Sequence, residues 1–294
     1  MLKGLKYCSS FENTNMIFFD LINKSNTVSK LLNEILRIND CLYKQIDSKT
    51  VPLTTDEFKC MKVKVELLIQ SEKDKSCILL VRGESNKKLN SKFNKGEFSK
   101  IFSIGEKAQN YLVDMNVERE DFKTINDVSQ KTMEWIFDQY AVINWGQSRL
   151  QKYFQTSINK NAFVDKLINN EKYRDYYLYG LQTEGSNRKV FFVSSSTSPK
   201  KALYDERRKI LILFWIPEPH IEYAQSKSSL SLVHSEIRSN GLPNLFDSYF
   251  PKEKEFSIKG AIFPDFIYAI IDVDNNIIII SPKLLINEQN WIKV

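Results

Sequence analysis

The stretch FIYAIIDVDNNIIIISP, residues 266–282, decides the fold class of this 294-residue chain. It contains two apolar runs of strand length, rich in isoleucine, on either side of the turn residues Asn275 and Asn276. Runs rich in β-branched residues and bounded by turn residues are typical of strands, and a short asparagine turn suits antiparallel neighbours. We therefore expect a β-sheet that includes this end of the chain.

The sequence predicts further strands on the N-terminal side of this stretch. The runs KVFFVSSS (189–196), KILILFWIP (209–217) and KEFSIKGAIFP (254–264) are rich in apolar and β-branched residues and are separated by turn residues. Much earlier, SCILLVRGES predicts a buried strand from Ser76 to Arg82 that ends at Gly83. These strands predict a mostly antiparallel sheet.

Helical patterns precede the strands. Residues 15–47 carry apolar side chains at helical spacing, interrupted near residues 23–27, which predicts two helices. A third helix is expected over residues 53–70, with Thr54 or Thr55 as its N-cap.

The order of these segments predicts an α+β fold. We expect an N-terminal helical region over residues 1–75 and a core over residues 76–294. Within the core, residues 97–189 have a helical pattern rich in tryptophan and tyrosine, which indicates a helical insertion.

The composition is that of a folded protein. Hydrophobic residues make up 42% of the chain and aromatic residues 12%, which is enough to build a core, so disorder is not expected. The formal net charge of +6 is compatible with an acidic or nucleic-acid partner without requiring one.

Cysteine and histidine usage disfavours a zinc site and a histidine-based catalytic triad. The four cysteines lie in the first 80 residues without a CxxC pair, and the chain has two histidines. The first residues lack a secretory signal pattern, and the longest apolar runs are too short to span a bilayer. We expect no metal, no membrane partner and a cytoplasmic location, or delivery into a target-cell cytoplasm by a specialised secretion route.

The segment YFPKEKEFSIKGAIFP, residues 249–264, places Glu253 and Glu255 one residue apart at the start of a predicted strand. Side chains at positions i and i+2 of a strand lie on the same face, where two carboxylates repel one another. The pair is therefore a candidate for two carboxylates with a functional role. A competing pair, Glu218 and Glu222, lies in PEPHIE, where prolines break regular strand geometry.

Three motifs now follow one another along the chain: RG at residues 82–83, SSS at 194–196 continuing into SPKKA, and EKE at 253–255. This order resembles the arginine–serine–glutamate class of mono-ADP-ribosyltransferases. Members carry an arginine followed by glycine on the first core strand, then a Ser-Thr-Ser motif, then a Glu-x-Glu motif that leads into an apolar strand and a glycine turn. Here the central threonine is serine, and the stretch between the first two motifs is longer than in a minimal member.

The resemblance implies transfer of one ADP-ribose from NAD⁺ to a macromolecule, in the manner of a bacterial or phage toxin or effector. Cleavage of the bond between nicotinamide and ribose builds positive charge on the sugar, as in glycoside hydrolysis. By resemblance, Glu255 stabilises this charge and holds the ribose 2′-hydroxyl, Ser194 orients Glu255, and Glu253 accepts a hydrogen bond from the nucleophile. Arg82 is then the group that binds the pyrophosphate through a bidentate fork.

The same resemblance assigns the other members of the NAD⁺ site and the surface for the acceptor. Gly83, Ser195 and Ser196 join Arg82 and the first serine of the cluster in holding NAD⁺, the expected co-substrate. Tyr249 and Phe250 precede the glutamate pair, where the class has a loop that recognises the acceptor.

Two classes of acceptor are compatible with the sequence. Glu-x-Glu favours an arginine in a protein, whereas the positive net charge leaves room for a base of RNA or DNA. A neutralising antitoxin or immunity protein is a further partner to consider. A non-catalytic binding protein that keeps the fold is the other alternative, and the retained arginine, serine and glutamates argue against it.

Overall fold

The protein is described here by a computed structural model in which the chain splits into two compact units. The first unit comprises Met1–Phe102, Ser195–Ile221 and Phe263–Val294, and the second comprises Ser103–Ser194 and Glu222–Ile262. The structure describes residues 17–38, 41–46, 49–85, 103–104, 170, 173, 192–203, 209–217, 224–226, 236–237, 239–240, 255–259, 261–262 and 266–286.

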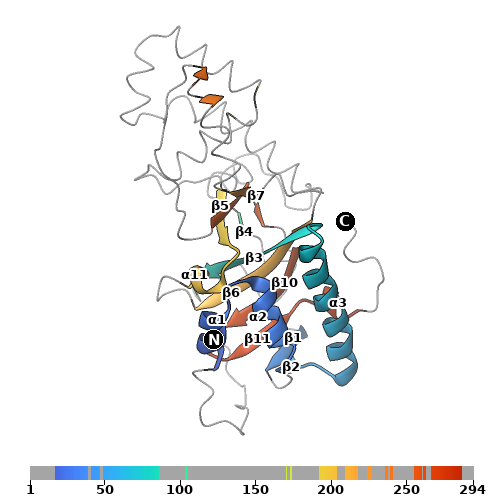
Figure 1. Ribbon diagram of the computed structural model, residues 1–294. Helices are drawn as coiled ribbons and strands as arrows, with labels where there is room; N and C mark the ends of the chain where they lie inside the picture. Colours follow the sequence, from blue (N-terminus) through green and yellow to red (C-terminus); the bar gives the residue numbers. More distant parts are fainter. Residues whose placement is uncertain are drawn as a thin grey trace, which may run out of the picture. The chain divides into compact units, whose positions relative to one another are not determined.

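The first unit contains helices and a sheet (Figure 1). Its helical elements are α1 (Ile17–Lys24), α2 (Val28–Ile35), α3 (Thr55–Lys73), α11 (Pro199–Ala202) and the 3₁₀ helix η8 (Pro282–Leu284). Its strands are β1 (Leu42–Ile46), β2 (Lys49–Pro52), β3 (Cys77–Glu84), β6 (Ile210–Pro217), β10 (Ile267–Asp272) and β11 (Ile277–Ile280), and β5 (Phe192–Ser196) crosses the boundary between the units.

The strands of the first unit follow the order β2-β1-β11-β10-β6-β3, with β5 next to β3. Within the described part of the chain, β1 and β11 pair in parallel, and the other recorded pairings are antiparallel. The predicted α+β class with a mostly antiparallel sheet is therefore confirmed. The centre of the sheet is β6, all of whose residues are buried and which pairs with β3 from Cys77↔Pro217 to Glu84↔Ile210.

The hairpin predicted from residues 266–282 is present as β10 and β11, closed by the pair Asp272↔Ile277. Asn276 takes a positive φ of 50°, a left-handed conformation that asparagine tolerates better than most residues. Asp272 accepts hydrogen bonds from the backbone N–H and side-chain amide of Asn275 at 3.2 and 2.7 Å. Burial raises the pKa of Asp272, and these hydrogen bonds oppose the rise.

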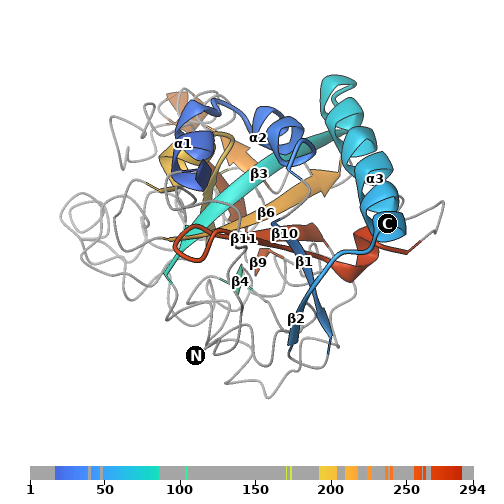
Figure 2. The ribbon, with the colours of Figure 1, turned by 90° about the horizontal axis from the view of Figure 1, so that it is seen from below.

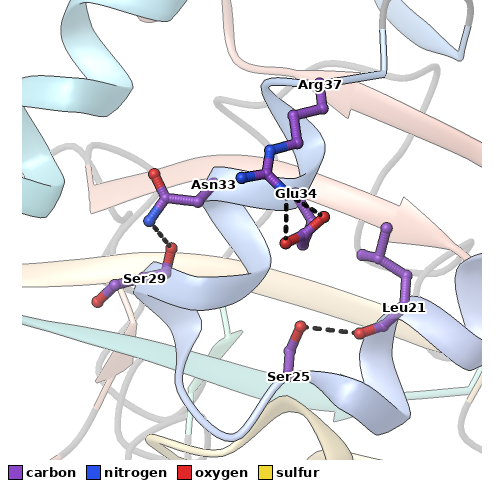
Figure 3. Close-up of polar contacts among 6 residues, drawn as sticks. All are labelled: Leu21, Ser25, Ser29, Asn33, Glu34 and Arg37. Atoms are coloured by element: carbon purple, nitrogen blue, oxygen red, sulfur yellow. Dashed lines mark hydrogen bonds and ion pairs between the residues drawn. The ribbon is translucent and has the colours of Figure 1, made fainter.

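The predicted break between the first two helices is confirmed, and local hydrogen bonds explain it (Figure 3). The Ser25 hydroxyl donates to the carbonyl oxygen of Leu21 at 2.8 Å, which satisfies an acceptor in the last turn of α1. Thr27 then caps α2, because its hydroxyl oxygen accepts the backbone N–H of Lys30 at 3.2 Å. Along α2, the side-chain amide of Asn33 donates to the Ser29 carbonyl oxygen at 3.0 Å.

The third predicted helix begins as expected, with Thr54 as its N-cap. Thr54 and Glu57 form a capping box in which each side chain accepts a hydrogen bond from the other residue's backbone N–H. Helices α2 and α3 contact each other, and both contact β3 (Figure 2). The buried faces of these helices and the central strands thus form one core.

The prediction of helix through residue 47 is wrong, because Leu42–Ile46 forms β1. This segment has apolar residues that fit a helical spacing, but its neighbours in space decide its structure. Leu42 pairs with Ile278 of β11, and Tyr43 pairs with Pro52 of β2. Pairing with a strand on each side overrides the local helical preference of this segment.

The strand predicted from Ser76 to Arg82 corresponds to β3. Its expected end at Gly83 is wrong, because β3 continues through Gly83 to Glu84. Gly83 pairs with Leu211 of β6, and both residues are buried. Glycine punctuates a strand only where the chain is free to turn, and here the ladder with β6 holds the backbone extended.

Two lysines connect α3 to other elements of the first unit. Lys44 of β1 forms an ion pair with Glu57 in the first turn of α3. Lys64 is buried, and its ammonium group donates to the carbonyl oxygens of Lys283, at 2.6 Å, and Ile286. A buried lysine that binds carbonyl oxygens fixes the segment after β11 against the helix.

We expect Glu57→Gln to lower the free energy of unfolding at pH 7 by about 1 kcal/mol, because glutamine can still close the capping box but lacks the charge that pairs with Lys44 and that interacts favourably with the N-terminus of the helix. Burial opposes ionisation of Glu57, but the hydrogen bonds from Lys44 and Thr54 outweigh it and lower its pKa. The stabilisation is therefore full above the ordinary pKa of a glutamate and is lost as the pH falls through the lower folded-state pKa. Urea unfolding at several pH values should show the difference between wild type and variant shrinking below about pH 4. A difference that is constant with pH would contradict this account.

The second unit contains two antiparallel pairs of strands among its described residues. The first pair is β7 (Ala224–Ser226) with β8 (Glu255–Lys259), and the second is β4 (Ser103–Ile104) with β9 (Ala261–Ile262). The Tyr173 hydroxyl donates to Glu236 at 3.0 Å and accepts from the side-chain amide of Asn240 at 2.8 Å. The other residues of the predicted insertion at 97–189, apart from residues 103–104 and 170, lie outside the described residues.

No helix among the described residues is both long enough and apolar enough to cross a membrane.

Candidate functional site

Arg82 lies near the C-terminal end of β3, between two partner strands. It pairs with Ile212 of β6, and its neighbour Val81 pairs with Ser196 of β5. Leu79, Leu80 and Val81 of the strand are buried in the core, which fixes the backbone that carries the arginine. The motif arginine and the serine cluster are therefore on adjacent strands, and Gly83 lies beside Arg82 in the same ladder.

Arg82 is held by a residue that the sequence analysis did not single out. The Arg82 Nε–H donates to Oε1 of Glu84 at 2.7 Å, a distance typical of a charge-assisted hydrogen bond. The Arg82 side chain is 16% exposed and that of Glu84 is 2% exposed. The two residues are at positions i and i+2 of one strand, so they lie on one face. The same spacing rule that singled out Glu253 and Glu255 could have found this pair.

The serine cluster forms the end of β5 and the entry to α11. Ser195 and Ser196 are buried, whereas Ser194 is partly exposed. The Ser196 hydroxyl oxygen accepts the backbone N–H of Ser198 at 3.0 Å, which turns the chain into α11 with Pro199 at its first position. The SPKKA part of the motif is thus a short helix after the strand, and α11 contacts β3.

Strand alternation sorts the serines relative to Arg82. Val81 and Ser196 are directly opposite across the ladder, so their side chains share one face of the sheet. The preceding serine, Ser195, and the following residue of β3, Arg82, therefore share the other face. Among the three serines of the cluster, Ser195 is thus the one on the same face of the sheet as Arg82.

Glu255 is the first residue of β8. The strand order places β8 between β5 and β7, with Ser257 and Ile258 of β8 buried. The side chain of Glu255 lies outside the described residues, and so do Glu253, Tyr249 and Phe250 entirely. The competing residues Glu218 and Glu222 also lie outside them.

Cys77 is at the start of β3, the end away from Arg82, and it is a poor nucleophile. Burial raises the pKa of the Cys77 thiol to about 12, and the negative charge of Glu72 adds to the effect. The thiol is therefore protonated at neutral pH, and the thiolate is the reactive form. Burial likewise raises the pKa of Tyr268 well above its usual value. Both groups belong to the core.

The described part of the chain contains no cluster of three or more histidine, cysteine, aspartate or glutamate residues that could hold a metal ion. The chemistry of the described site thus consists of one guanidinium, one buried carboxylate and serine hydroxyls.

Comparisons with known proteins add no relative. Neither the models of protein families, nor the curated proteins, nor the solved structures contain a match to this chain.

Proposed function

We propose that the protein is an NAD⁺-dependent mono-ADP-ribosyltransferase that acts on a macromolecular acceptor, with an arginine of a protein as the favoured target. One observation carries the proposal: the arginine of the RG motif and the serine cluster, more than 100 residues apart in the sequence, lie on the adjacent strands β3 and β5. Motifs that match by chance have no reason to be neighbours in the sheet.

The polar groups on β3 and β5 suit the pyrophosphate of NAD⁺. The guanidinium of Arg82 offers a planar set of N–H donors that matches phosphate oxygens, and it is fixed by Glu84. Hydroxyl groups of the serine cluster are the neutral donors expected beside an anion. These features support the binding half of the proposal.

In the catalytic part of the proposal, Glu255 acts on the ribose of NAD⁺. Departure of nicotinamide leaves positive charge on the sugar, and a carboxylate beside that charge lowers the barrier. Glu253 accepts a hydrogen bond from the attacking group, and Ser194 orients Glu255. Tyr249 and Phe250 contact the acceptor. No metal takes part, and the ADP-ribosyl group goes from nicotinamide to the acceptor in one exchange of glycosidic bonds.

The proposal is tested by the release of nicotinamide from NAD⁺ by the purified full-length chain. Chromatography should detect free nicotinamide that accumulates with time and in proportion to protein. Calorimetry should detect binding of NAD⁺ in the same preparation. Protein that binds no NAD⁺ and releases no nicotinamide would show that the chain is not such an enzyme.

Glu253→Gln should reduce transfer to the acceptor by about tenfold more than it reduces hydrolysis of NAD⁺. The reason is that a guanidinium nucleophile needs a carboxylate to accept its proton, whereas water needs less help. Acceptor labelling and nicotinamide release, measured side by side on the same preparation, give the ratio. An equal loss of both activities would contradict the role assigned to Glu253.

A further inference from the structure

The Arg82–Glu84 pair is asymmetric in its exposure. The carboxylate of Glu84 is almost fully buried, whereas the Arg82 side chain retains contact with solvent. A buried carboxylate is costly unless a cation and hydrogen bonds compensate it, and the contact to Nε at 2.7 Å supplies both. Glu84 is therefore shielded from solvent, and Arg82 is the member of the pair that a ligand can reach.

The atom that Glu84 binds matters for the direction of the guanidinium. The group is planar, so fixing the direction of the Nε–H bond fixes the plane of the group and the direction of its terminal nitrogens. Glu84 contacts the edge that contains Nε, and the edge formed by the two terminal nitrogens is the second edge suited to two parallel hydrogen bonds.

We propose that Glu84 is a positioning residue that holds the Arg82 guanidinium in the direction needed to bind a diphosphate anion. The inference rests on the proposed function, in which that anion is the pyrophosphate of NAD⁺. Arginine loses considerable conformational freedom when it is immobilised. With Glu84 in place, the Arg82 side chain loses this freedom when the protein folds. Binding of the anion then costs no further conformational entropy at Arg82.

A purely structural role for the pair explains less. Buried ion pairs are generally no more stabilising than apolar residues of similar size, so stability alone does not account for a carboxylate at position 84. A purely electrostatic role would also have the opposite sign, because a nearby negative charge weakens the attraction of Arg82 for an anion. Removal of Glu84 therefore separates positioning, which predicts weaker binding, from charge alone, which predicts tighter binding.

The test uses the full chain with three substitutions of Glu84 and one control. Glu84→Ala removes the contact, Glu84→Asp keeps the charge but withdraws the oxygen by one methylene, and Glu84→Gln keeps an acceptor oxygen without the charge. Asp272→Asn is the matched control, because Asp272 is a second buried acid of the same unit whose recorded partner is Asn275 in its own turn. Calorimetry measures the Kd for inorganic pyrophosphate and for NAD⁺, and thermal unfolding checks folding.

We expect Glu84→Ala and Glu84→Asp to weaken binding of both probes by about tenfold, because Arg82 must then lose its conformational freedom when the anion binds. Glu84→Gln should stay within about threefold of wild type, because its amide oxygen still accepts the Nε–H. Asp272→Asn should leave both Kd values unchanged. In nicotinamide release, the change for Glu84→Asp should fall on KM, with kcat within about threefold of wild type.

Three results would overturn the inference: wild type that does not bind pyrophosphate, Glu84→Asp that binds as tightly as wild type, or Glu84→Gln as weak as Glu84→Asp. If Glu84→Ala fails to fold, the comparison of the aspartate and glutamine variants still decides. Pyrophosphate binding with the expected order of variants, but without nicotinamide release, would overturn the proposed function and leave the positioning role in place.

Discussion

Glu255→Gln should reduce the release of nicotinamide from NAD⁺ by at least about 100-fold, with little change in the Kd for NAD⁺. The expectation follows from the role assigned to Glu255, because a glutamine is nearly the same size but lacks the charge that stabilises the developing cation on the ribose. Removal of one such electrostatic contact typically costs 100- to 1000-fold in rate, about 3–4 kcal/mol of barrier. Initial rates at saturating NAD⁺ measure the effect.

The matched control is Glu66→Gln on α3, since Glu66 is an exposed glutamate that forms an ion pair with Lys62 at the surface. It should retain the full rate of nicotinamide release. A Glu255→Gln variant as active as Glu66→Gln would remove Glu255 from the catalytic site.

Arg82→Met should lower the free energy of unfolding by about 3 kcal/mol, because the buried carboxylate of Glu84 then loses its cation. Breaking a buried ion pair from one side is usually more destabilising than replacing both partners. The double substitution Arg82→Met and Glu84→Met should therefore recover most of the loss. Urea unfolding of the two single variants, the double variant and wild type completes the thermodynamic cycle.

The cycle also separates stability from binding. The double variant should be folded and yet bind no NAD⁺, since the guanidinium is gone. If the single variant Arg82→Met is as stable as wild type, Glu84 does not depend on Arg82, and the pair described here is energetically unimportant.

Local sequence patterns predicted the elements whose signals are short-range. The β10–β11 hairpin follows from two isoleucine-rich runs around Asn275 and Asn276, and the start of α3 follows from the capping residue Thr54. The break between α1 and α2 likewise follows from polar residues that hydrogen-bond to nearby backbone groups.

Elements fixed by distant pairing were not predictable in this way. The helical spacing of the residues that form β1 predicts the wrong structure, because the strand is held by pairing with β2 on one side and with β11, more than 200 residues later, on the other. The expected strand end at Gly83 is likewise wrong, since pairing with β6 holds the backbone of Gly83 extended. The sheet order that joins the first and last segments of the chain has no local signal.

The candidate site was predictable in its residue types but not in its supporting contacts. The RG and SSS motifs were expected at the ends of strands, and β3 and β5 are neighbours. Glu84 belongs to none of the three motifs, and its role follows only from its contact with Arg82, two positions earlier on the same face of β3. Ser195, rather than Ser194, lies on the face of Arg82, a distinction that requires the Val81↔Ser196 register.

The transfer of label from NAD⁺ to an acceptor tests the central claim most directly. The full-length protein is incubated with NAD⁺ labelled in its adenylate phosphate and with a cell lysate, and the macromolecular fraction is then digested with protease or with nuclease. We expect covalent label that depends on Glu255 and that protease releases, in keeping with a protein arginine as acceptor. Label released by nuclease alone would show that the acceptor is a nucleic acid. No label in any fraction, with no nicotinamide released, would contradict the account and leave a binding protein.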